Sequence, residues 1–445
     1  MAQRQFKSTD SSIWAEKYGN GSDGSLTINS PTTDSTANTS CSGVIGSTTL
    51  NVGSSTGFAN GNLLLIHQSR NGGDSTGSWE LNKISSGGDT TSWTLGYSLT
   101  NNYNTTSQVY LLKQYSSVTV DDTLTANAWN GSYGGIIAFL CNGTISGSGT
   151  ITLTGKGYRG YGDNPGPFDA TGDQGEGYSA GGGVRSNSAN GNGAGGGTNA
   201  GGTQKGGGGG GGNISAGTAG SDSGGGAGGK AGALLSNASL TKMGFGGAGG
   251  QSGVFNLGTN PGEGGGILLC IGAVINFSSM SGIQTNGGDG QGTTNTSIMR
   301  GDGGGAGGSI LLKGVTITLG TNKLTATGGA GGSDLGGAGS AGAIHADYAG
   351  SITGTTTPTL DSTLDSTENT STSTSTTTST STSSSTTTTM SVTTSTSTTS
   401  TSSSTSTTST STSTTTTSTS TTSTSSTTTS TTITLPFHLD IDAGR

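Results

Sequence analysis

The sequence Gly134-Gly-Ile-Ile-Ala-Phe-Leu-Cys-Asn-Gly-Thr-Ile145 carries the clearest internal repeat of this chain. It returns as Gly265-Gly-Ile-Leu-Leu-Cys-Ile-Gly-Ala-Val-Ile275 and as Gly307-Gly-Ser-Ile-Leu-Leu-Lys-Gly-Val-Thr-Ile317. From the first isoleucine of each copy to its closing glycine there are 19, 20 and 18 residues. Each copy joins a continuous apolar segment to a Thr-rich alternating segment, which is the pattern of two β-strands of different burial.

The repeat predicts stacked strands. One unit cannot bury its own apolar face, whereas several units stacked rung on rung bury a continuous core. A weaker fourth copy begins at Gly342 and a truncated copy at Gly232. We therefore expect an all-β chain in which residues 131–360 form a glycine-rich, β-solenoid-like repeat domain.

Glycine fills the long intervals between these copies. Of the 89 glycines, 73 lie between Gly131 and Gly350. The Gly-X-Y period of collagen is absent, but runs such as Gly206–Gly212 can adopt the polyproline-II conformation with its three residues per turn. Because bare glycine faces allow close approach, we expect polyglycine-II layers here. Disorder, which Gly and Ser also favour, is the alternative.

Residues 1–130 have a different character, and all four tryptophans of the chain lie among them. Short apolar or alternating segments such as 62–68, 78–84 and 116–120 are separated by turn clusters such as Asn71-Gly-Gly-Asp. Six or seven short strands at this spacing are typical of antiparallel folds. We expect a β-rich head domain, either a β-sandwich or a small barrel.

The end of the chain is of low complexity. From Thr370 to Thr432 every residue is Ser or Thr except Met390 and Val392. Such a segment has nothing with which to build a core, so we expect residues 361–432 to be a disordered spacer, either bare or O-glycosylated. Residues 433–445 form a short apolar and acidic tip peptide.

Bulk composition excludes several classes of function. The formal net charge is −8 and only 9% of residues are charged, which argues against a nucleic-acid binder. No apolar run approaches the ~18 residues of a membrane span, and the N-terminus shows no recognisable signal peptide. The three cysteines, Cys41, Cys141 and Cys270, form no paired motif. Buried or free thiols are favoured over one disulfide.

The density of glycine also produces motifs that imitate enzymes. Gly224-Gly-Gly-Ala-Gly-Gly-Lys-Ala231 nearly matches a P-loop, but Ala231 stands where a magnesium-binding Ser or Thr is required. Gly73-Asp-Ser75-Thr-Gly matches a nucleophile elbow, but a strand follows where a helix is needed, so it reads as a hairpin turn. We expect no enzyme, no catalytic residue, no cofactor and no metal site.

One loop combines carboxylates with aromatic rings. Such a loop could bind a sugar, or calcium through oxygen ligands, and paired carboxylates could hydrolyse a glycosidic bond. An ordinary solvated loop is the alternative. The candidate ligand-binding residues are Tyr158, Tyr161, Asp163, Phe168, Asp169, Asp173, Glu176 and Tyr178.

The alternation of Gly-Gly-apolar rungs with glycine runs over residues 131–350 resembles glycine-rich adhesins, in particular the receptor-binding tips of phage tail fibres. The stretch Phe58-Ala-Asn-Gly-Asn-Leu-Leu-Leu-Ile-His-Gln68 is similar to the β-rich heads of bacterial β-solenoid surface proteins and tail spikes. The resemblance implies polyglycine-II layers whose loops touch a receptor. The Ser/Thr tail departs from phage tips and looks like a cell-surface stalk.

Three functions follow from these observations. The first is a non-enzymatic adhesin or receptor-binding structural protein of a cell surface or virion, whose exposed loops contact a glycan or a host-surface receptor. The second is a passive fibre or coat protein, and the third is a polysaccharide-degrading β-solenoid enzyme. We expect an extracellular, cell-surface or virion location and no membrane insertion. A monomer and a homo-oligomer both stay open.

Overall fold

The computed structural model describes residues 17–71, 73–161, 171–199, 206–253, 260–293, 300–333 and 335–365. The spacer predicted over 361–432 begins too early, because Asp361–Leu364 form strand β20, which pairs with the preceding strand. The rest of the spacer beyond residue 365 and the tip peptide lie outside the described residues. Within them the fold is all-β, and the one helical turn is the 3-10 turn η1 (Gly73–Ser75). The all-β prediction is therefore confirmed for the described part of the chain.

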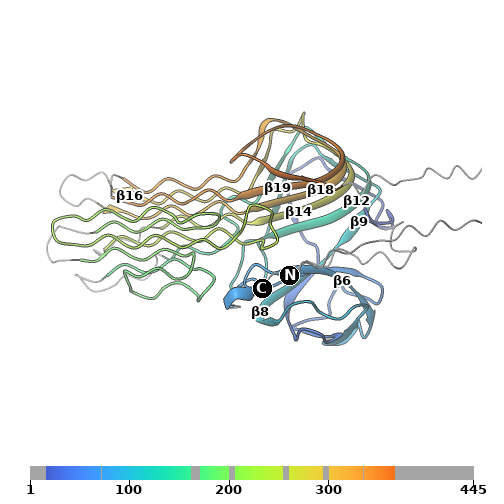
Figure 1. Cartoon of the computed structure of the whole chain (residues 1–445), viewed down its shortest axis with the longest axis horizontal. Coiled ribbons are helices and arrows are strands. Elements are labelled where there is room, and N and C mark those ends of the chain that lie inside the picture. The colour runs from blue at the N-terminus through green and yellow to red at the C-terminus, as the bar shows by residue number, and fades with distance from the viewer. Residues whose placement is uncertain are drawn as a thin grey trace, which may run out of the picture. The chain divides into compact units, whose positions relative to one another are not determined.

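Six antiparallel strands near the N-terminus close into a barrel (Figure 1). Their order around the barrel is β3 (Asn38–Gly43), β4 (Thr49–Val52), β7 (Ser92–Leu95), β6 (Trp79–Ser86), β5 (Leu63–His67) and β8 (Tyr103–Leu111). Leu50, Leu64 and Trp93 lie at its centre, each almost fully buried. The second form predicted for the head, the small barrel, is the one present. The η1 turn joins β5 to β6, so the predicted hairpin at Gly73 is also present.

The barrel is an insertion in the solenoid. Before it come β1 (Ser25–Ile28) and β2 (Thr32–Asp34), and after it come β9 (Lys113–Tyr115), β10 (Ser117–Val120) and β11 (Thr123–Ala126). β1 pairs with β10 and β2 pairs with β11, in both cases parallel. The head predicted over 1–130 therefore includes strands that belong to the solenoid. The reason is that an alternating pattern identifies a half-buried strand but not its partner.

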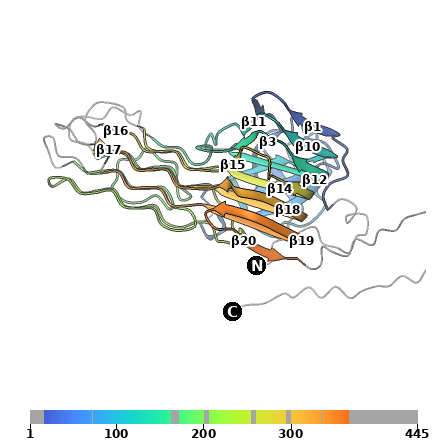
Figure 2. The same ribbon diagram turned by 90° about the horizontal axis from the view of Figure 1, so that it is seen from above.

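The solenoid is one sheet of twelve strands that wraps through three faces (Figure 2). Its remaining strands are β12 (Ile136–Ser146), β13 (Thr150–Thr152), β14 (Ile267–Asn276), β15 (Gly282–Gln284), β18 (Ser309–Thr325), β19 (Ala343–Thr357) and β20 (Asp361–Leu364). The copies beginning at Gly134, Gly265, Gly307 and Gly342 are thus successive rungs. The truncated copy at Gly232 forms no strand. A separate two-stranded ribbon pairs β16 (Gly292–Thr293) with β17 (Arg300–Gly301).

Aliphatic side chains stack in columns inside the solenoid. One column runs through all six rungs as Leu26, Val118, Ile145, Ile275, Ile317 and Ile352. A second runs as Thr32, Leu124, Ile151, Ile283, Leu324 and Thr356. The middle members of both columns are fully buried. These columns form the core that a single copy of the repeat could not build.

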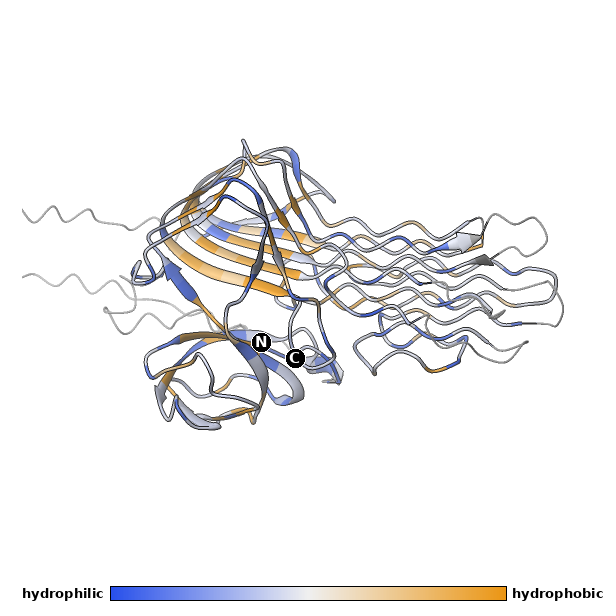
Figure 3. Ribbon diagram, turned by 180° about the vertical axis from the view of Figure 1, so that it is seen from behind, coloured by the Kyte–Doolittle hydropathy of each residue, from blue (hydrophilic) through white to orange (hydrophobic). Residues whose placement is uncertain are grey.

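The solenoid face that contains residues 136–141, 267–272 and 309–314 is buried on both sides. This explains the continuous apolar runs. Ile137 and Phe139 of β12 point into the solenoid core, whereas Ala138 and Leu140 belong to a second core. That second core includes barrel side chains such as Leu65 and an aromatic group of Trp129, Tyr158 and Phe245. Parallel strands covered on both faces lose the alternation of apolar and polar residues. Figure 3 shows these strands as adjoining hydrophobic bands.

The glycine runs pack as a lattice of extended chains. The N–H groups of Gly206–Gly212 donate in turn to three neighbouring segments, and every third residue returns to the same neighbour. Gly206, Gly209 and Gly212 donate to segment 192–198, Gly207 and Gly210 to segment 217–221, and Gly208 and Gly211 to segment 301–304. A three-residue period is that of the polyproline-II helix. The predicted polyglycine-II arrangement accounts for this bonding.

The carbonyl groups of the same run serve three further neighbours. They accept from segments 247–253, 229–232 and 337–340, again with a period of three. The central run is therefore hydrogen-bonded to six surrounding segments, and Gly206–Gly212 are all buried. A Cβ added to any of them would lie between 1.8 and 2.4 Å from a carbonyl oxygen. Glycine is required here because other backbones occupy the space of a side chain.

Candidate functional site

Glu176 is the most enclosed charge among the predicted site residues. Its carboxylate is fully buried and accepts from Arg159 Nε at 2.9 Å and from the Arg159 backbone N–H at 3.1 Å. It also pairs with the guanidinium of Arg70, which follows barrel strand β5. Two arginines from regions far apart in sequence thus meet on one carboxylate. Glu176 ties the glycine region to the barrel.

The three described tyrosines of the predicted site surround this ion pair. Tyr158 is fully buried, donates its hydroxyl to the Ser69 carbonyl and packs on Phe245 with ring centroids 5.4 Å apart. The Tyr178 carbonyl accepts from the Asn71 N–H at 2.7 Å. The half-buried Tyr161 ring lies 5.3 Å from the guanidinium carbon of Arg159. Tyr158 and Tyr178 therefore bind the barrel, whereas the half-buried Tyr161 ring packs on Arg159.

Asp173 lies apart from this group. It is buried, and its Oδ1 lies 3.8 Å from Arg185 Nε. Burial raises the pKa of Asp173, and the charge of Arg185 opposes that rise. Asp163, Phe168 and Asp169 lie outside the described residues. The predicted sugar- or calcium-binding group thus stays a prediction, with Tyr158, Glu176 and Tyr178 brought together and Asp173 held elsewhere.

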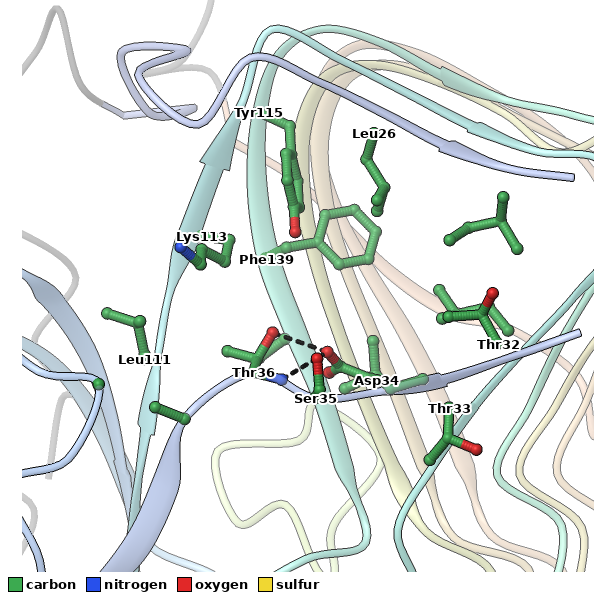
Figure 4. Close-up of a pocket in the computed structure, with 16 residues that line it drawn as sticks. Leu26, Thr32, Thr33, Asp34, Ser35, Thr36, Leu111, Lys113, Tyr115 and Phe139 are labelled. Carbon is green, nitrogen blue, oxygen red and sulfur yellow. Dashed lines mark hydrogen bonds between the residues drawn. The ribbon is translucent and has the colours of Figure 1, made fainter. Parts of the chain in front are cut away.

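A pocket that the sequence did not indicate opens at the N-terminal end of the solenoid (Figure 4). Its volume is about 380 Å³, and β1, β2, β9, β11 and β12 contribute to its lining. Leu26, Phe139 and Tyr115 form apolar walls, with the two rings 6.1 Å apart. The residues from Thr32 to Thr36 place hydroxyl groups on its rim. The pocket can accept a small group that is apolar on one side and polar on the other.

Asp34 is the acidic group of this pocket. It accepts hydrogen bonds from the Tyr110 hydroxyl and from the backbone and side chain of Thr36. Burial, together with the negative charges of Asp34 and Asp23, raises the pKa of Tyr115 to about 12. Tyr115 therefore remains an uncharged phenol at neutral pH. No sequence signal could have found this pocket, because the barrel insertion separates β2 from β9 and β11.

A cluster of charged groups lies at the opposite end of the solenoid. His345 is buried, with Nδ1 2.8 Å from Asp361 Oδ2 and Nε2 3.0 Å from Asp347 Oδ1. Lys313 pairs with the other oxygen of Asp347. Burial alone would raise the pKa of Asp347, but the hydrogen bonds and charges of His345 and Lys313 lower it to about 2. The cluster joins β18, β19 and β20.

The described residues include no group of three or more His, Cys, Asp or Glu side chains arranged to hold a metal ion. Cys41, Cys141 and Cys270 are buried free thiols, as favoured from the sequence. Burial raises the pKa of the Cys41 and Cys270 thiols. Among the same residues there is no helix with the length and hydropathy needed to cross a bilayer.

Comparison with known proteins finds a weak structural similarity and no match in sequence. No protein-family model matches the chain, and no curated protein matches it. Among solved structures the chain is similar to the Gp54 tailspike of Acinetobacter baumannii bacteriophage AP22, solved in complex with an A. baumannii capsular saccharide. The identity is 10%, the match covers 76% of this chain and 58% of the tailspike, and the TM-score is 0.17. Two chains with so low a TM-score do not share a superimposable fold, so the likeness carries no functional weight.

Proposed function

We propose that this chain is a non-enzymatic adhesin or receptor-binding structural protein of a cell surface or a virion, which contacts a glycan or a surface protein. The observation that carries the proposal is the glycine lattice. A central run bonded to six neighbours is a stiff support, and it extends away from the stacked rungs (Figure 1). Such a support suits a protein that presents chain segments at a distance from its core.

Several described segments of the support meet at one end. Gly253 donates to Gly206, Gln291 donates to Asn260, and Gly332 donates to Asp302. We call the region around Asn260, Gln291 and Asp302 the lattice end. We expect sequence changes at the lattice end to alter recognition without disturbing the rungs.

The proposal of a non-enzymatic role is supported by the state of Glu176. A catalytic acid or base must reach a substrate, but Glu176 is fully buried and paired with Arg70 and Arg159. Its role in this geometry is to hold the barrel. A polysaccharide-degrading function would need a different pair of carboxylates.

The test is binding of the labelled full chain to a glycan array and to intact cells. The variant Asn260→Ala with Gln291→Ala alters the lattice end, and Asn51→Ala on the outer surface of barrel strand β4 is the matched control. We expect binding by the wild type and the control, with a loss in the double variant. Self-association into fibres without binding would favour the passive fibre or coat protein.

An enzyme assay separates the remaining alternative. Release of sugars from a polysaccharide by the wild type, lost in a folded Asp173→Ala variant, would overturn the non-enzymatic proposal. The virion and the cell surface can be told apart by the neighbouring genes, since tail-assembly genes indicate a virion and secretion genes indicate a cell surface.

A further inference from the structure

One face of the solenoid carries two columns of small polar side chains. The face is built from residues 25–27, 117–119, 144–146, 274–276, 316–318 and 351–353, which run parallel and in register (Figure 2). The middle residue of each triplet points inward as part of the first aliphatic column. The two flanking residues therefore point outward, because side chains alternate along a strand. We call these outward positions the hydroxyl face.

The hydroxyl face is uniform over six rungs. Ten of its twelve positions are Ser or Thr, and none is charged or aromatic. The first column is Ser25, Ser117, Thr144, Val274, Thr316 and Ser351, and the second is Thr27, Thr119, Ser146, Asn276, Thr318 and Thr353. All twelve are exposed or half-buried. The face is therefore open to solvent.

Most of these hydroxyl groups have no partner within the described part of the chain. Ser117 donates to Ser25 at 2.9 Å, and Asn276 accepts from Ser278 at 2.7 Å. The side chains that make no hydrogen bond to a described residue are those of Thr27, Thr119, Thr144, Ser146, Thr316, Thr318, Ser351 and Thr353. A hydroxyl group both donates and accepts. The face thus offers a regular set of unused donors and acceptors.

The spacing of this set follows from the geometry of the sheet. Neighbouring rungs lie about 4.8 Å apart, and residues two apart along a strand are separated by about 6.6 Å. Another solenoid face carries one outward column of this length, made of Thr33, Thr125, Thr152, Gln284, Thr325 and Thr357. Its second outward column is interrupted at Gly282, so that face lacks a paired column. On the barrel, Thr49 pairs with Thr94 across only two strands. The six-rung register makes the hydroxyl face a two-dimensional array.

We infer that the hydroxyl face binds the surface of ice. Hexagonal ice exposes water oxygens in a regular two-dimensional array, and each water can donate or accept. Neutral hydroxyl groups match either orientation of the water hydrogens, and the threonine methyl groups cover the spaces between them. A protein or a charged ligand would be held through aromatic anchors or complementary charges. The face provides neither.

Because each hydroxyl–water bond replaces another bond to water, one of them contributes little by itself. Binding therefore depends on many hydroxyl groups engaging at once, and a bulky group at the centre of the array prevents that. Thr119 and Thr318 belong to the second column on rungs two and five. Tyrosine at these outward positions is compatible with a strand, because aromatic residues are favoured there.

The experiment measures partition of the purified full chain into a slowly growing ice hemisphere, together with inhibition of ice recrystallisation. The variants are Thr119→Tyr with Thr318→Tyr, and Thr94→Tyr as the control on an exposed barrel position. We expect the wild type and the control to be enriched in ice and the double variant to be excluded. Circular dichroism and the melting temperature check that all three are folded.

Two results would overturn the inference. One is exclusion of the wild type from ice. If the wild type is excluded from ice but is retained on an insoluble polysaccharide, and the double variant is not retained, the hydroxyl face binds polysaccharide instead. The other is a folded double variant that partitions like the wild type. Should the tyrosine variant fail to fold, Thr119→Val with Thr318→Val removes the hydroxyl groups at nearly constant shape. A loss of ice partition in that pair supports the inference, and unchanged partition contradicts it.

Discussion

The solenoid and the glycine lattice hold extended chains together in opposite ways. In the solenoid each strand bonds to neighbours within a sheet, and side chains such as Ile275 fill the space inside. In the lattice the run Gly206–Gly212 bonds to six neighbours, and no side chain separates them. The comparison teaches that side chains limit a strand to two bonded neighbours. Removing them allows bonding in every direction around the chain axis.

The largest effect is expected from one methyl group in the lattice. In Gly208→Ala the new Cβ would lie 1.8 Å from the Gly250 carbonyl oxygen, so a backbone segment must move. We expect a loss of about 3 kcal/mol or more in the free energy of unfolding. Urea unfolding followed by circular dichroism measures it.

The matched control is Gly282→Ala in solenoid strand β15. There the Cβ would meet only Gln284 Nε2 at 3.1 Å, the end of a flexible side chain. We expect little change, because the side chain can move aside. Equal costs at Gly208 and Gly282 would show that the two regions do not differ as described.

In the solenoid, the corresponding change is the removal of a side chain. Ile275→Ala opens a gap in the middle of the first aliphatic column, and we expect a loss of about 2–5 kcal/mol. Its neighbour Val274 is 38% exposed, so Val274→Ala should cost less than about 0.5 kcal/mol. Thermal melting of both variants tests this, and similar losses at both positions would contradict the inward column.

The seam between the barrel and the glycine region should respond to pH. His67 is buried, with Nε2 2.6 Å from the Met243 carbonyl, and burial lowers its pKa from 6.5 to about 4. The carbonyl must accept, so the neutral ring donates from Nε2. Below pH 6.5 the unfolded chain binds a proton that the folded chain does not take up until about pH 4.

Stability should therefore fall by about 3 kcal/mol between pH 6.5 and pH 4 from this group, at about 1.4 kcal/mol for each pKa unit. Urea midpoints of the wild type and of His67→Gln over this range provide the measurement. The variant should be less stable at pH 7 but should lose less on acidification. Parallel curves would exclude His67 as the source.

The smallest effect is expected from deletion of 370–432. This segment is Ser and Thr apart from Met390 and Val392, and such a sequence buries no apolar surface. The melting temperature of the rest should remain unchanged. A clear fall would mean that the comparison between solenoid and lattice omits a third contributor to stability.

The sequence predicted the rungs better than their partners. The copies at Gly134, Gly265, Gly307 and Gly342 stand out because an apolar run between glycines has few alternatives to a buried strand. The alternation of Ser117–Val120 predicts a strand of the head, because it fits an antiparallel strand equally well. The neighbours of Gly206–Gly212 could not be predicted, since a residue without a side chain carries no pattern that identifies a partner.

The candidate site was less accessible to sequence reasoning. Glu176 resembled an exposed acid beside aromatic rings, but its partner Arg70 lies 106 residues away. The pocket beside Asp34 depends equally on the return of the chain after the barrel. A local pattern indicates which residues have useful chemistry. Contacts between residues distant in sequence decide whether such a side chain stabilises the fold or remains free to bind a ligand.

The barrel insertion has a consequence for the order of folding. Ser25 of β1 pairs with Ser117 of β10, and an unstructured loop between them would have to close over the whole intervening sequence. Closing a long loop costs conformational entropy that grows with its length. Three of the six barrel pairings join strands that are consecutive in sequence, and the closed barrel brings Asn38 next to Tyr110. Once the barrel has formed, β1 and β10 are already close together. Formation of the barrel therefore lowers the entropy cost of closing the first turn of the solenoid.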